Sequence, residues 1–145
     1  MTLSDIRLID LSHGIAGAYL GRLFVDAGAE VIRVEPVEGV ELRRRSAAPL
    51  APGQDGPLFS FLAAGTRSVV GVLGDEAVES LLTGAVGVIV DGALTAADVM
   101  AIADRHPEMV ITSIRPYGLT GPWADRTPNE FLVQADSGSV LCRGH

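Results

Sequence analysis

His13 and the glycine-spaced turn after it are the first residues of the chain that could do chemistry. The apolar run at 6–11 ends just before Ser12 and His13, and Gly14 and Gly17 follow within four residues. If a helix begins at this turn, its first amides point into the space beside the imidazole, and such amides attract negative groups. His13 is then either a hydrogen-bond donor to a ligand or a structural cap of the turn, and the sequence leaves both open.

Three consecutive arginines, Arg43, Arg44 and Arg45, form a second candidate site. All eleven basic residues of the chain are arginine, whose planar guanidinium pairs with a phosphate through two hydrogen bonds. The three lie in the stretch 36–57, whose four prolines and three glycines exclude long regular structure. Charge runs are also common in solvated loops, so the alternative is a surface segment without a ligand.

Glu35, Arg115 and Tyr117 follow later apolar runs and are further candidates for ligand contact. Glu35 stands where the ribose-binding acid of an NAD-binding fold would stand, but the glycines do not complete the G-x-G-x-x-G pattern, so a dinucleotide site is only weakly indicated. Arg115 and Tyr117 could equally serve loop packing. No G-x-S-x-G nucleophile motif is present. No metal site is expected, because the candidate ligands lack ligand spacing: His13, His106, His145 and Cys142.

Alternating strands and helices must position these residues. The segment 6–35 predicts a strand, an amphipathic helix ended by Gly28 and a second strand, which together make a right-handed β-α-β unit. Such alternation continues along the chain and favours an α/β fold with a mostly parallel sheet, whose ligands bind at the carboxyl ends of the strands. The later expected strands are 67–72, 85–90 and 109–114; the expected helices start near Asp75, Thr95 and Asn129, with a turn or two of helix at 58–64.

Composition narrows the class of protein. The 145 residues are 48% hydrophobic, enough for one domain with a core, and the net charge of -7 argues against nucleic acid as the main partner. No apolar run approaches the roughly 18 residues of a membrane span, so no membrane partner is expected. One cysteine excludes an internal disulfide and favours a cytoplasmic location. The end of the chain soon after a helix suggests a fragment of a longer protein.

Four motifs together resemble the class III CoA-transferases. The segment DAGAEVIRVE at 26–35 is similar to the family's DLGAEVIKVE, and TRSV at 66–69 to its KRSV strand. SIRPYGLTGP at 113–122 resembles SISGFGQTGP, and 130–138 resembles the helix YDLIAQAMSG. The matches occur in order and at compatible spacing over most of the chain, which makes them specific as a set.

The resemblance implies a single Rossmann-like domain over 1–145, a parallel sheet with helices on both faces that is the N-terminal part of the family's fold. It implies acyl-CoA and a carboxylic acid as substrates, with CoA moved between acids through an enzyme-bound aspartyl anhydride and thioester, no metal, and a homodimer of full-length chains. By matched position, the CoA-contacting residues would be His13, Ile15, Ala16, Arg44, Arg115 and Tyr117. The family's nucleophilic Asp is expected beyond His145, so the chain alone should show no turnover.

Three alternatives stay open beside that enzyme. One is a degenerate, non-catalytic CoA-transferase-like module, favoured by the short segment after Val90 where the family has a longer CoA-contacting loop. Another is a racemase-like enzyme, disfavoured because Asn129 precedes Glu130 where the racemases carry His before the acid. The last is a nucleotide-binding Rossmann domain unrelated to CoA.

Overall fold

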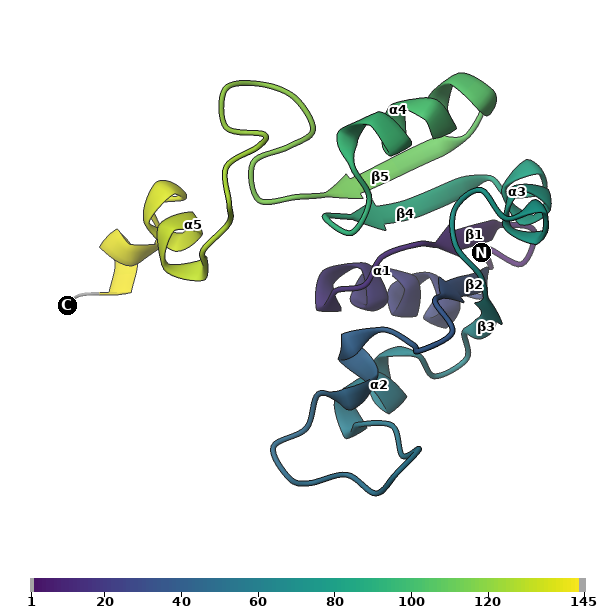
Figure 1. The fold of residues 1–145 in the computed structure, drawn as a ribbon, viewed down its shortest axis with the longest axis horizontal. Coiled ribbons are helices and arrows are strands. Elements are labelled where there is room, and N and C mark those ends of the chain that lie inside the picture. Colours follow the sequence, from purple (N-terminus) through teal and green to yellow (C-terminus); the bar gives the residue numbers. More distant parts are fainter. Residues whose placement is uncertain (1, 144–145) are drawn as a thin grey trace. The chain divides into compact units, whose positions relative to one another are not determined.

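The computed structural model describes residues 2–143 and divides into two units, each considered by itself. The first unit extends to Ile114 and contains the sheet; the second begins at Arg115. Five parallel strands form the sheet of the first unit, in the order β3-β2-β1-β4-β5 (Figure 1). Their bounds are β1 Arg7–Asp10, β2 Glu30–Glu35, β3 Arg67–Val70, β4 Gly87–Asp91 and β5 Val110–Ile114.

Helices cover both faces of this sheet. Figure 1 shows α1 and α2 on one side and α4 on the other, the arrangement that right-handed crossovers produce when the strand order reverses at β1. The α/β fold expected from the sequence is therefore confirmed. The helices are α1 Ile15–Asp26, α2 Pro57–Leu62, α3 Glu76–Thr83 and α4 Ala96–Arg105, with a 3₁₀ turn η1 at Glu41–Arg44; the second unit holds α5 Glu130–Asp136 and a 3₁₀ turn η2 at Ser139–Arg143.

Local sequence signals set several element ends. The Thr95 side chain accepts a hydrogen bond from the Asp98 amide and the Asp98 carboxylate accepts one from the Thr95 amide, so the capping box at α4 is confirmed. Asp75 stands at the N-cap of α3, but its carboxylate accepts from the Val72 amide at 2.8 Å and makes no bond to the helix. The third strand ends at Val70, two residues earlier than predicted.

One hydrophobic cluster holds η1 and α2 against α1. Its buried members come from three segments of the chain: Ala18, Val40, Leu42, Phe59 and Leu62. Sequence patterns did not predict η1, because its one buried side chain, Leu42, gives no periodicity. The cluster matters for function because it fixes the arginines of η1 beside the start of α1.

Gly17 allows α1 to begin against the end of β1. The Cβ of an alanine at this position would lie 1.9 Å from the Oγ and 2.4 Å from the Cβ of Ser12, whose side chain is fully buried. Both distances are far below van der Waals contact, and neither atom is the free end of a long side chain. The second glycine of the turn is therefore required for close helix-sheet packing.

Candidate functional site

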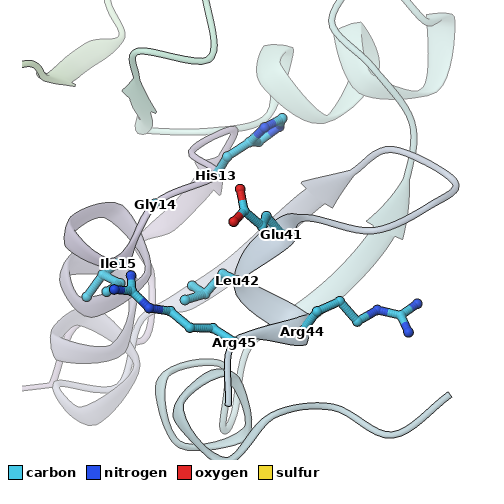
Figure 2. A pocket seen from close by; sticks show the side chains of 7 residues that line it. All are labelled: His13, Gly14, Ile15, Glu41, Leu42, Arg44 and Arg45. Atoms are coloured by element: carbon cyan, nitrogen blue, oxygen red, sulfur yellow. The ribbon is translucent and has the colours of Figure 1, made fainter. Parts of the chain in front are cut away.

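A cavity of about 460 Å³ lies where β1 ends, between the start of α1 and η1 (Figure 2). Its lining joins residues about thirty positions apart in the sequence: His13, Gly14, Ile15, Glu41, Leu42, Arg44 and Arg45. Three predicted contact residues, His13, Ile15 and Arg44, thus meet in one cavity. Ala16, a fourth, is exposed beside it in the first turn of α1 but does not line it.

The charged side chains of η1 leave the turn in different directions. In Figure 2, Arg45 extends toward Ile15, Arg44 extends the opposite way, and the Glu41 carboxylate points toward the loop that carries His13. Arg44 and Arg45 are exposed. The two exposed guanidinium groups beside this cavity can pair with phosphate or carboxylate groups of a ligand.

The Arg43 side chain, unlike those of Arg44 and Arg45, is bound within the protein. Its Nε and Nη2 donate to the two carboxylate oxygens of Glu35 at 2.6 and 2.8 Å, and its Nη1 donates to Asp55 at 2.7 Å. The guanidinium also lies 4.2 Å from the ring centre of Phe59. The expectation that all three arginines meet phosphate is corrected for Arg43, because its side chain joins β2, α2 and the intervening loop.

Glu35 is likewise engaged within the protein. Its side chain is 3% exposed and accepts a third hydrogen bond, from the Ser68 hydroxyl at 2.8 Å. Burial alone would raise the pKa of the Glu35 carboxyl, but the hydrogen bonds from Arg43 and Ser68 outweigh burial and lower it. A carboxylate held in this way is not open to a ribose, which disfavours the dinucleotide interpretation of Glu35.

The His13 turn is held by its backbone. The amides of His13 and Gly14 both donate to Oδ2 of Asp91, at 2.9 and 2.8 Å, across the boundary between β1 and β4. No side-chain hydrogen bond of His13 is found among residues 2–143, and its imidazole is exposed. The cap of the turn is therefore the backbone with Asp91, which leaves the imidazole for a ligand.

His13 also borders a second, smaller cavity of about 210 Å³. The wall of this cavity is mostly apolar and comes from the ends of β1 and β2 and from the loops after β3 and β4: Leu11, Val34, Pro36, Gly71, Val72, Leu73, Ala93 and Leu94. The imidazole therefore stands between a cavity with charged walls and one with apolar walls.

Beneath the site, Asp10 ties β1 to β2. Its Oδ1 accepts from the amide of Ser12 at 2.9 Å and from the Ser12 hydroxyl, and its Oδ2 accepts from Nη2 of Arg33. All three side chains are buried. Burial raises the pKa of the Asp10 carboxyl, against the opposing effects of Arg33 and Ser12. This network orients Ser12, the residue that precedes His13.

Arg115 and Tyr117 lie in the second unit. The Tyr117 hydroxyl donates to Asp136 at 3.3 Å, and the Tyr117 ring meets Trp123 edge to face with centroids 6.0 Å apart. Arg126 donates to the same Asp136 oxygen at 3.0 Å. Sequence reasoning placed Asp136 inside the last helix, and it is the final residue of α5. The contacts of Arg115 and Tyr117 with a ligand stay a prediction.

Residues 2–143 contain no group of three or more His, Cys, Asp or Glu side chains that could hold a metal ion. None of the helices in that part is both long enough and apolar enough to cross a membrane.

Asp91 and Glu41 were not among the site residues predicted from the sequence. Asp91 could have been found, because it ends a strand and all strands of a parallel sheet end at the same edge. That inference needs β4 beside β1, which follows only from the strand order. Glu41 depends on η1, for which the sequence carried no signal.

Comparison with known proteins gives a consistent result. Residues 3–145 match the family described as CoA-transferase family III. The chain is 33% identical to succinate–glutarate CoA-transferase of Agrobacterium fabrum, over 98% of this chain and 39% of that protein. It is 28% identical to (R)-2-hydroxy-4-methylpentanoate CoA-transferase of Clostridioides difficile, over 97% and 38%. The crystal structure of a CAIB/BAIF family protein from Brucella suis superposes with a TM-score of 0.77 at 28% identity, over 94% of this chain and 39% of that one. The chain thus spans about two fifths of the length of the curated relatives it matches.

Proposed function

The chain belongs to CoA-transferase family III, and from this premise we propose that the cavity beside His13 binds the CoA part of an acyl-CoA. The observation that supports this most is the meeting of the His13 turn with Arg44 and Arg45 in one cavity. CoA is a long ligand with phosphates at one end and an uncharged pantetheine arm ending in the thioester. A cavity lined by two exposed guanidinium groups and by the exposed imidazole of His13 offers cations for the phosphates and a hydrogen-bond donor for the thioester.

Each lining residue has a distinct role in this proposal. Arg44 and Arg45 pair with phosphate oxygens. Ile15 and Ala16 border the pantetheine arm at the start of α1. The His13 imidazole donates a hydrogen bond to the thioester carbonyl, which gains negative charge when it is attacked. His13 is not assigned a general-base role.

The reaction proposed for the full-length protein is transfer of CoA between carboxylic acids. The relatives named above are CoA-transferases for succinate and glutarate and for a hydroxy acid. Transfer through an enzyme-bound acyl anhydride needs a carboxylate nucleophile, and we expect an Asp beyond His145 to supply it. Arg115 and Tyr117 are proposed to line the CoA channel of the complete protein. A cytoplasmic homodimer without a nucleic-acid or membrane partner is proposed for the full-length form.

Calorimetric titration of CoA into the 145-residue chain tests the binding step. We expect saturable binding by the wild type and weaker binding after replacement of Arg44 and Arg45, while the chain alone shows no CoA-transferase turnover. Thermal unfolding in the presence of CoA or of NAD compares the two ligands, because a ligand that binds only the folded state raises the melting temperature. Protection by NAD but not by CoA would contradict the proposal and favour the dinucleotide alternative.

A further inference from the structure

Asp91 takes a position that a phosphate would otherwise take. It is the last residue of β4, next to β1 in the sheet, and its Oδ2 accepts both amides of the turn that starts α1. Its Oδ1 accepts a third bond, from the Ala93 amide at 2.9 Å. Three backbone amides therefore orient the carboxylate. Two of them belong to His13 and Gly14, which line the cavity at the start of α1.

The amide of Gly14, the N-cap of α1, is one of the backbone donors that a bound anion would use at this turn, and the amide of His13 directly precedes it. Exposed amides at the start of a helix and the helix dipole together favour a negative group. Here the protein provides that group itself, and it packs closely: a Cβ built on Gly14 would lie 3.1 Å from Oδ2 of Asp91. A phosphate at the turn would have to displace the carboxylate or lie against it. A phosphate in contact with the carboxylate would be repelled, because both groups are negatively charged.

The other charged groups around the cavity also influence where a phosphate can bind. At the His13 end, Asp91 holds the turn and the Glu41 carboxylate points toward the same loop (Figure 2). Arg44, the last residue of η1, and Arg45, the residue after it, also line the cavity, and Arg45 extends toward Ile15 while Arg44 extends the opposite way (Figure 2). Asp10, a further carboxylate below the turn, is paired with buried Arg33. The two carboxylates near the His13 loop therefore repel a phosphate there, whereas the two guanidinium groups attract one.

We infer that Asp91 is a specificity-determining residue: its carboxylate fills the anion position at the start of α1, so that the turn accepts an uncharged part of the ligand and phosphates bind at Arg44 and Arg45. This inference rests on the proposed function for the identity of the ligand. It differs from the expectation, drawn from the sequence, that the amides of this turn attract a negative group of the ligand. Asp91 acts through the backbone of His13 and Gly14, without contact to the reacting atoms.

Titration of inorganic phosphate, followed through the backbone amide resonances of Gly14 and Ile15, tests the inference directly. Asp91→Ala frees the two amides, so we expect a saturable shift at these resonances, with phosphate bound about tenfold tighter than in the wild type. Asp104→Ala is the matched control, because it removes one exposed carboxylate of α4 and should leave the turn as inaccessible as in the wild type. Equal phosphate binding at the turn of the wild type and of Asp91→Ala would overturn the inference.

A second variant covers the case in which Asp91→Ala does not fold. Asp91→Ser keeps a short side chain with one oxygen but removes both the charge and the end of the side chain, so phosphate should again gain access to the turn. A folded Asp91→Ser with no gain in phosphate binding would overturn the inference. CoA titration separates the two claims: if CoA fails to bind the wild type while phosphate enters only the Asp91 variants, the proposed function fails and anion exclusion by Asp91 stands.

Discussion

The guanidinium of Arg33 and the carboxylate of Asp10 form an ion pair, 2.5 Å from Nη2 to Oδ2, in which both side chains are 1% exposed. The residues face each other on adjacent strands, and the guanidinium lies 5.9 Å from the ring centre of Phe59. Two other nitrogens of Arg33, Nε and Nη1, are buried without a hydrogen-bond partner among residues 2–143. Desolvation of this cation is therefore only partly compensated.

Breaking this pair from one side should be costly. Asp10→Leu leaves the Arg33 charge buried and unpaired, so we expect a loss of about 3–5 kcal/mol in the free energy of unfolding. The double variant Asp10→Leu with Arg33→Met replaces both charges by apolar side chains and should recover most of that loss. Urea unfolding of the two single variants and the double variant measures the coupling. A double variant as unstable as Asp10→Leu would show that the pair stabilises the fold beyond mere charge compensation.

The three adjacent arginines should separate into two classes. Arg43→Ala removes the partner of buried Glu35, so we expect a loss of about 1–3 kcal/mol in the free energy of unfolding. The pair Arg44→Ala and Arg45→Ala should leave stability within about 0.5 kcal/mol of wild type, because both side chains are exposed. The same pair should weaken CoA binding, and the difference from wild type should shrink at high salt because exposed charges are screened.

Arg67→Ala is the control for the arginine variants. Arg67 is an exposed arginine in β3 that pairs with Glu30, and it lies outside the cavity lining. Calorimetry at low and high salt should give the same CoA dissociation constant for this variant as for wild type. An unchanged CoA dissociation constant after replacement of Arg44 and Arg45 would show that these residues belong to a solvated surface segment without a ligand.

Gly17 and Gly92 should respond differently to the same substitution. Gly17→Ala places a Cβ 1.9 Å from Ser12 Oγ, so α1 must move away from β1, and overpacking of this kind costs about 1–3 kcal/mol. Gly92 has a negative φ and open space around its Cα, so Gly92→Ala should be close to neutral. Thermal unfolding followed by circular dichroism compares the two. Similar melting temperatures for both variants would show that the start of α1 can shift without cost.

Stability should fall in acid partly through Glu35. The pKa of Glu35 is lowered in the folded state, so its contribution is fully present above the unfolded pKa of about 4.3 and is lost as the pH falls through the folded pKa. Glu35→Gln removes the titration, so the free energy of unfolding should be lower at pH 7 and should fall less steeply between about pH 5 and pH 3. Glu30 and Asp98, whose pKa values are also lowered, leave some slope in the variant. Parallel pH profiles for both proteins would exclude Glu35 as a source of acid sensitivity.

The fold was more predictable from the sequence than the site. Strand patterns and the capping box at Thr95 and Asp98 are local signals, and the structure confirmed them. The division of labour among the arginines is not local, because Arg43 is drawn inward by Glu35, Asp55 and Phe59, which come from three other segments. Composition can identify a basic run, but only packing decides which of its members stays free for a ligand.

His13 offers the sharpest test of the binding site. Its backbone amide holds the turn through Asp91, and its imidazole is exposed at the cavity, so His13→Ala should keep the structural bond and remove only the side chain. We expect an unchanged melting temperature and a three- to tenfold larger dissociation constant for succinyl-CoA, which corresponds to about 0.5–1.5 kcal/mol for one hydrogen bond. Free CoA has no thioester carbonyl, so its dissociation constant should not change. His13→Asn keeps a donor at the position and should recover part of the affinity for succinyl-CoA. If His13→Ala instead melts much earlier while its folded fraction binds succinyl-CoA as the wild type does, the imidazole stabilises the fold and the hydrogen bond to the thioester is ruled out.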